Sequence, residues 1–135
     1  MSSETAGEQQ PLTIEFAADR RSASVARRMA TATLRGHRVP EELAGDIVQV
    51  VSELVTNAIK HGSAPAILEL ECVSAQVVVR VRDGGPGRPV LREQTVPPRP
   101  GGHGLRLVRA LATRWGYTRG AGGAPGKQVW AEFRR

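Results

Sequence analysis

The chain has 135 residues, 40% of them hydrophobic, which suits one domain with its own core. Its formal net charge of +6 suits an acidic partner such as nucleotide phosphate, nucleic acid or an acidic protein face, although arginine-rich composition alone is the simpler explanation. A single cysteine excludes an intrachain disulfide, and no apolar run reaches the ~20 residues of a transmembrane helix. Because the chain starts with polar residues rather than a signal peptide, we expect a cytoplasmic protein with a disordered leader over residues 1–11 and one domain over residues 12–135.

The first part of the domain predicts a strand and then a helix. Residues 12–16 alternate apolar and polar side chains, as in a strand with one buried face. Asp19 offers a helix-start residue, and residues 22–35 carry apolar side chains at helical spacing. Gly36 is predicted to stop this helix.

A longer helix is predicted from Pro40 to His61, with Gly62 ending it. One face is apolar, and Glu53 and Asn57 lie one turn apart on the other face. A carboxylate and a carboxamide on one rigid element suit Mg²⁺ and phosphate chemistry. A polar stripe is also what solvent exposure alone produces, so the interpretation depends on the glycine clusters that follow.

Two alternating runs, residues 66–73 and 76–82, predict a β-hairpin. Glutamates of its first strand are expected to face arginines of its second, namely Glu69, Glu71, Arg80 and Arg82. A helix over residues 105–114 and strands over residues 115–119 and 127–133 follow. This order predicts an α+β fold, a two-layer sandwich whose mixed, mostly antiparallel sheet is covered on one face by helices.

Asp83 and the two glycine clusters are the candidate ligand-binding segments. Asp83 meets glycines where a strand ends, and its carboxylate could accept a hydrogen bond from an exocyclic amine such as that of adenine, or simply cap a turn. Gly85 and Gly87 would let a base lie against the backbone. Residues 88–100, rich in proline, would form a short lid.

The second cluster, Gly102-His103-Gly104, opens a helix whose free N–H groups and dipole suit a phosphate. It lacks the Gly-Lys-Ser/Thr of a P-loop and the βαβ setting of a dinucleotide site. Together, the pieces predict a nucleotide site in which Glu53 lies near the terminal phosphate and could deprotonate an attacking hydroxyl.

The three segments, in this order, resemble the three boxes of the Bergerat-fold ATPase superfamily, which includes gyrase, a class of heat-shock chaperones and the histidine kinases. The matching residues are Glu53-x-x-x-Asn57-Ala58 with His61-Gly62, Asp83-x-Gly85-x-Gly87, and Gly102-x-Gly104-Leu105. The compact size and the short lid most resemble the anti-sigma-factor serine kinase branch.

The resemblance implies the Bergerat ATP-binding fold with ATP and Mg²⁺ as cofactors. It implies that Asn57 binds Mg²⁺, that Asp83 contacts adenine and that Glu53 activates the hydroxyl. The third box, including His103 and Leu105, would hold phosphate. Gln128 stands where close relatives often have a threonine that helps to close the adenine pocket, so it is a further candidate contact.

The same resemblance implies a protein that sequesters a sigma factor, phosphorylates a serine on an anti-anti-sigma partner with a STAS domain, and forms a homodimer. The alternative is a binding module in which ATP shapes a partner surface and no phosphate moves. Direct nucleic-acid binding is disfavoured, because aromatic residues are few (4%) and the arginines are dispersed rather than interleaved with them.

Overall fold

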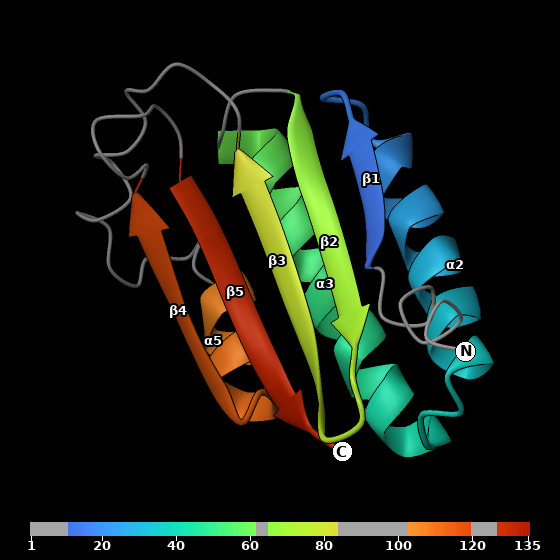
Figure 1. Ribbon diagram of the computed structural model, residues 1–135. Helices are drawn as coiled ribbons and strands as arrows, with labels where there is room; N and C mark the ends of the chain where they lie inside the picture. The colour runs from blue at the N-terminus through green and yellow to red at the C-terminus, as the bar shows by residue number, and fades with distance from the viewer. Residues whose placement is uncertain (1–10, 62–64, 84–102, 120–126) are drawn as a thin grey trace.

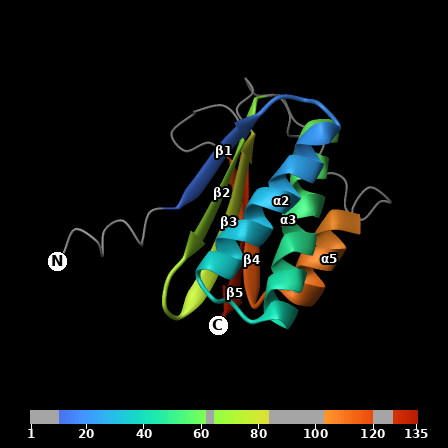
Figure 2. The same ribbon diagram turned by 90° about the vertical axis from the view of Figure 1, so that its right-hand side faces the viewer.

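The computed structural model describes residues 11–61, 65–83, 103–119 and 127–135, which form two layers, a sheet and a set of helices on one of its faces (Figure 2). The elements are β1 (Leu12–Phe16), α2 (Arg21–Gly36), α3 (Glu41–His61), β2 (Ala66–Cys72), β3 (Gln76–Asp83), α5 (His103–Leu111), β4 (Arg114–Arg119) and β5 (Lys127–Arg134). The strand order is β1-β2-β3-β5-β4, and each of these pairings is antiparallel (Figure 1). Among the described residues, no helix is long and apolar enough to cross a membrane.

Every predicted helix and strand is present, with small differences at the ends. The last helix runs over His103–Leu111 rather than 105–114, because the backbone N–H of Thr113 already donates to the carbonyl of Glu132 in β5, at 2.8 Å. Asp83 is the last residue of β3 instead of the first residue after it. The predictions for the leader, Gly62, the lid and the two glycine turns fall outside the described residues.

Alternation along the strands gives the sheet one apolar face, and the helices cover it. Buried side chains from the sheet include Leu68, Val79 and Phe133, and α3 contributes Val51 and Leu54. The helices pack close to this face because each fully buried aliphatic side chain contributes roughly 1.5–3 kcal/mol. The cysteine also lies on this face.

Cys72 is buried, and this burial raises the pKa of its thiol. The positive charge of Arg135 opposes the increase, and the negative charge of Glu71 adds to it. The thiol therefore stays protonated at neutral pH and behaves as a small apolar side chain of the core.

The start of α2 is as predicted, and its end differs. The carboxylate of Asp19 accepts a hydrogen bond from the backbone N–H of Arg21, at 2.8 Å. Gly36, however, is still helical, and Arg38 takes the left-handed conformation, with φ of 58°. Val39 donates from its backbone N–H to the carbonyl of Leu34, at 3.0 Å, and both side chains are buried. This Schellman arrangement, with its apolar contact, places the left-handed residue two positions after the glycine.

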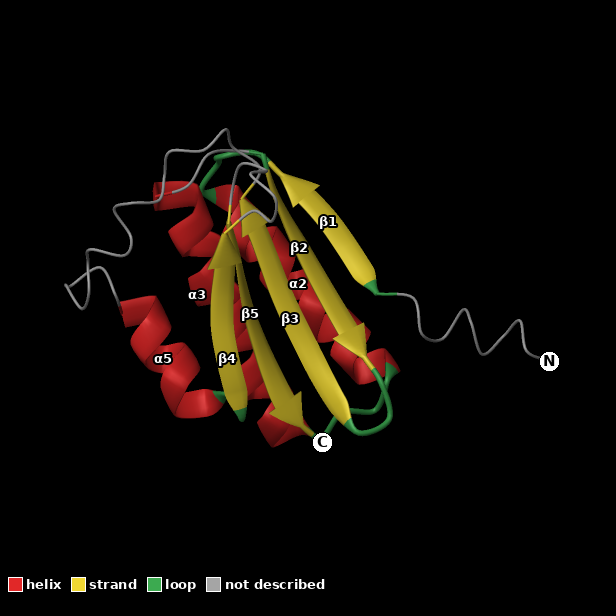
Figure 3. Ribbon diagram, turned by 60° about the vertical axis from the view of Figure 1, so that its left-hand side comes forward, coloured by secondary structure: helices red, strands yellow, loops and turns green. Residues whose placement is uncertain are grey.

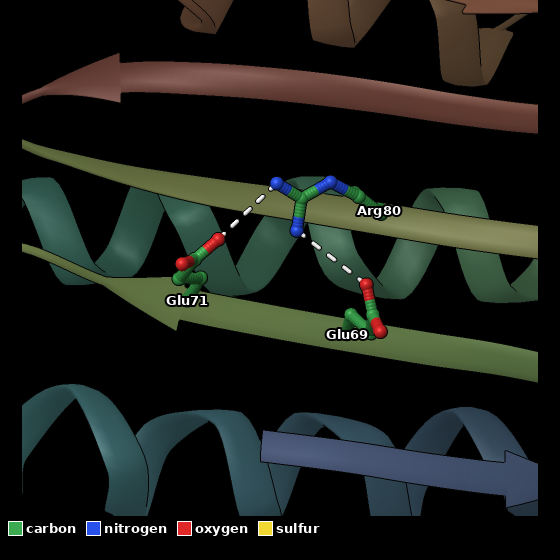
Figure 4. A network of polar contacts seen from close by, with 3 residues as sticks. All are labelled: Glu69, Glu71 and Arg80. Atoms are coloured by element: carbon green, nitrogen blue, oxygen red, sulfur yellow. Dashed lines mark hydrogen bonds and ion pairs between the residues drawn. The ribbon is translucent and has the colours of Figure 1, made fainter. Parts of the chain in front are cut away.

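The other face of the sheet is not covered by a described helix (Figure 3). On this face the guanidinium of Arg80 in β3 pairs with two glutamates of β2, with Glu69 at 3.4 Å and Glu71 at 3.1 Å (Figure 4). The hairpin prediction was therefore right for Arg80 and wrong for Arg82. Arg82 stands opposite Ile67 and is exposed, whereas Arg80 stands directly opposite Glu69 and pairs with both glutamates.

Gly116 and Trp130 lie opposite each other on this uncovered face, where β4 pairs with β5. A Cβ at residue 116 would lie 2.8 Å from Cζ2 of Trp130, which is closer than carbon atoms normally approach. Gly116→Ala is therefore expected to destabilise the protein by about 1–3 kcal/mol in urea unfolding, since the indole has to move.

Gly45→Ala is the matched control, because a Cβ at this helical glycine of α3 would meet no atom within 4 Å. That substitution should stabilise the protein by about 0.5–1 kcal/mol. In a Trp130→Leu background the penalty of Gly116→Ala should shrink. An equal or raised stability of Gly116→Ala in the native background would contradict the predicted clash.

Candidate functional site

The candidate site is organised by the orientation of α3 about its own axis. Val50, Val51 and Leu54 are fully or almost fully buried toward the sheet. Glu53 is therefore turned to the side of the helix, where it is half-buried, and Asn57 follows one turn later on the same side, also half-buried. The structure therefore confirms the prediction that Glu53 and Asn57 lie on the same side of one helix.

Glu53 lines a groove between α3 and α5 with a volume of about 440 Å³. Gln49 and Glu53 form the α3 wall, and Arg106, Leu107 and Ala110 form the α5 wall. The two helices run in opposite directions, and α5 begins beside the middle of α3 (Figure 1). The start of α5 therefore lies close to the carboxylate-bearing side of α3.

Asp83 is the only charged side chain that is buried among the described residues, with 4% of its surface exposed. It belongs to the same face of β3 as Val79 and Val81, which is the face that the helices cover. The strand β3 packs against α3, and both elements end at the same end of the molecule (Figure 1). Asp83 and Asn57 therefore lie toward the same end of the molecule.

Gln128 is separated from this group by the register of the sheet. It stands opposite Arg82 on one side and Thr118 on the other, and side chains opposite each other share a face. Since Asp83 follows Arg82 directly, Asp83 and Gln128 belong to opposite faces of the sheet. The sequence predicted that Gln128 and Asp83 contact the same adenine, but the structure places them on different faces of the sheet.

The glycine boxes are described only in part. Gly85, Gly87 and Gly102 lie outside the described residues. His103, Gly104 and Leu105 form the first turn of α5, so the helix begins inside the second glycine cluster, two residues before the predicted start at residue 105.

Sequence reasoning missed the α5 wall of the groove. Arg106 and Ala110 are four residues apart and so share a face of a helix, which the sequence could have indicated. It could not indicate which helix this face meets, because α3 and α5 are separated by more than forty residues of chain. The opposition of Arg106 and Glu53 across the groove depends on tertiary packing.

The donor groups of the site suit a hard cation that takes most of its ligands from phosphate and water. In the described parts of the chain, no cluster of three or more histidine, cysteine, aspartate or glutamate side chains could form a protein cage. A carboxamide oxygen, such as that of Asn57, is a suitable single protein ligand for Mg²⁺ when phosphate oxygens supply the others. The residues present therefore fit Mg²⁺ bound together with a nucleotide.

A family model described as "Histidine kinase-like ATPase domain" matches residues 16–133, a range that includes the described helices α2, α3 and α5 and every described strand except most of β1 and the last residue of β5. The chain belongs to this family. Membership confirms the expected superfamily and makes ATP the expected ligand of the domain.

Two known proteins show how the domain occurs elsewhere. The chain is 35% identical over 75 residues to the signal transduction histidine-protein kinase AfsQ2 of Streptomyces coelicolor, a match covering 46% of this chain and 14% of that protein. It superposes with a TM-score of 0.69 and 23% identity on the crystal structure of the RsbU and RsbW domains of Rv1364c from Mycobacterium tuberculosis. That match covers 92% of this chain and 31% of the other.

The chain thus spans only a small part of each of these longer proteins. The superposition confirms the fold predicted from the sequence, a two-layer α+β sandwich with an antiparallel sheet covered on one face by helices. Membership in the family establishes an ATPase-type, kinase-like domain.

Proposed function

We propose that this protein binds Mg-ATP and transfers its terminal phosphoryl group to a serine of an anti-anti-sigma partner with a STAS domain, and that it also sequesters a sigma factor. The observation that carries the proposal is the position of Glu53, whose carboxylate lines the groove between α3 and α5 beside the start of α5. The likeness in fold to a structure that contains an RsbW domain supports this class of partner. A homodimer is part of the proposal through the resemblance of the sequence alone.

In the proposed reaction, the serine Oγ attacks the terminal phosphorus of ATP. A bond forms between these two atoms, the bond from phosphorus to the oxygen bridging the β-phosphate breaks, and the electron pair leaves with ADP. The carboxylate of Glu53 accepts the hydroxyl proton. When bound, Mg²⁺ would neutralise phosphate charge, with the carboxamide oxygen of Asn57 as its protein ligand.

Asp83 would select the base. A buried carboxylate at the end of β3 offers a strong acceptor to the exocyclic amine of adenine. Hydrogen bonds to charged groups are worth roughly 1.5–3 kcal/mol, so this contact alone would contribute about one to two powers of ten in affinity.

The second candidate function is a binding module in which nucleotide shapes a partner surface without phosphoryl transfer. It needs the same nucleotide pocket but no catalytic role for Glu53. Both functions share one pocket, so phosphate transfer to the partner separates them.

Glu53→Gln tests the proposed base. The variant should bind ATP with an affinity close to that of the wild type but transfer phosphate about 10²–10⁴-fold more slowly, since an amide cannot accept the hydroxyl proton. The measurement is incorporation of labelled phosphate into STAS-domain partner proteins. Glu42→Gln, on an exposed first-turn position of the same helix, is the control and should transfer at the wild-type rate. Equal rates for Glu53→Gln and wild type would exclude Glu53 as the base.

Asn57→Ala tests the metal ligand. Calorimetric titration of the wild type should show ATP binding that Mg²⁺ strengthens by about tenfold or more compared with EDTA. The variant should lose this difference because the carboxamide oxygen is gone. Thr56→Ala, at the preceding position of α3 and hence on another side of the helix, should keep it. A Mg²⁺ effect that survives in Asn57→Ala would show that the ion is held elsewhere.

Asp83→Asn tests base recognition. ATP binding should weaken by about 10- to 100-fold, because the charged acceptor is lost. Binding of inorganic tripolyphosphate, which has no base, should be unchanged. Gln128→Ala should leave ATP affinity unchanged, since the register places residue 128 on the opposite face of the sheet from Asp83. Urea unfolding of each variant separates lost affinity from lost folding, and a parallel loss of tripolyphosphate binding by Asp83→Asn would contradict the assignment.

A further inference from the structure

Arg106 stands across the groove from the proposed base. It lies on α5, which begins at His103, and it lines the groove together with Glu53 of α3. The resemblance to known families pointed to the glycines before this helix and assigned no role to Arg106. The groove nevertheless has a cation on one wall and a carboxylate on the other.

These two charges do not neutralise each other directly. Among the described residues, Arg106 makes no ion pair within 4.0 Å and no side-chain hydrogen bond, and it is exposed. Arg80, by contrast, is held by two glutamates. The groove that Arg106 and Glu53 line, of about 440 Å³, is open to solvent, so a group from solution has access to both side chains.

The position of Arg106 on the helix indicates what that group is. Long side chains on an α-helix lean toward its N-terminus, so a guanidinium at residue 106 is within reach of the start of α5. The first-turn N–H groups and the positive end of the helix dipole favour an anion at that end. A guanidinium adds a forked pair of donors that matches the oxygens of a phosphate.

We infer that Arg106 binds the terminal phosphate of ATP, opposite Glu53, and so makes the site prefer ATP over ADP. This inference rests on the proposed function, because it requires a nucleotide in the groove. With Arg106 on the phosphate and Glu53 on the hydroxyl, the two walls would hold the two reacting groups. The guanidinium would also stabilise the charge on the transferred phosphoryl oxygens.

The test is calorimetric titration of ATP and of ADP, each with Mg²⁺, on the wild type and three variants. Arg106→Ala should weaken ATP binding by about 10- to 100-fold and change ADP binding by less than about threefold, since ADP lacks the contacted phosphate. Arg106→Lys should fall between Arg106→Ala and wild type, because it keeps the charge and loses the forked geometry. Arg109→Ala is the matched control, since Arg109 is exposed on the same helix but does not line the groove, and it should bind both nucleotides as the wild type does.

The outcomes separate the inference from the function on which it rests. A wild type that binds neither nucleotide would overturn both. A wild type that binds both, with Arg106→Ala weakening ATP and ADP equally or weakening neither, would overturn the inference and leave the nucleotide site standing. Unchanged nucleotide binding with a raised KM for the acceptor protein alone would also overturn it, and would assign Arg106 to the acceptor. Thermal unfolding of each variant confirms that the fold is intact.

Discussion

The burial of one face of α3 against the sheet is the constraint on which the rest of the structure depends. Val50, Val51 and Leu54 are almost completely removed from solvent, and each contributes roughly 1.5–3 kcal/mol. Rotating the helix by one residue would expose part of this face, so the rotation is strongly determined. That rotation alone turns Glu53 toward α5. The chemistry of the site therefore follows from the packing of the apolar residues next to it.

The packing of the sheet determines the position of Asp83 in the same way. Alternation along β3 buries Val79 and Val81 and, at the end of the strand, Asp83. Asp83 is the only buried charged side chain among the described residues, and a carboxylate is costly to bury without a polar partner, so the end of β3 is a polar point in this face. Helix α3 and strand β3 end at the same end of the molecule, which brings an amide and a carboxylate to one region without any flexible segment (Figure 1).

The two faces of the sheet have separate roles. The face under the helices holds the core and Asp83, whereas the uncovered face carries the ion pairs of Arg80, the Gly116–Trp130 contact and Gln128. Ion pairs at such half-exposed positions are typically worth less than about 1 kcal/mol each, so they support the hairpin register more than the overall stability.

By itself, the sequence determined the local structure and the chemical character of the site. Periodicity of 3.6 and of 2 predicted the helices and strands, and the spacing of Glu53 and Asn57 predicted a shared face, because these patterns depend on neighbouring residues only. The tertiary structure alone decided that α5 lies beside α3, so that Arg106 opposes Glu53. It also decided the sheet register, which puts Gln128 on the face away from Asp83. Such contacts join segments far apart in the chain, and they are selected by how whole faces pack together, which no local pattern encodes.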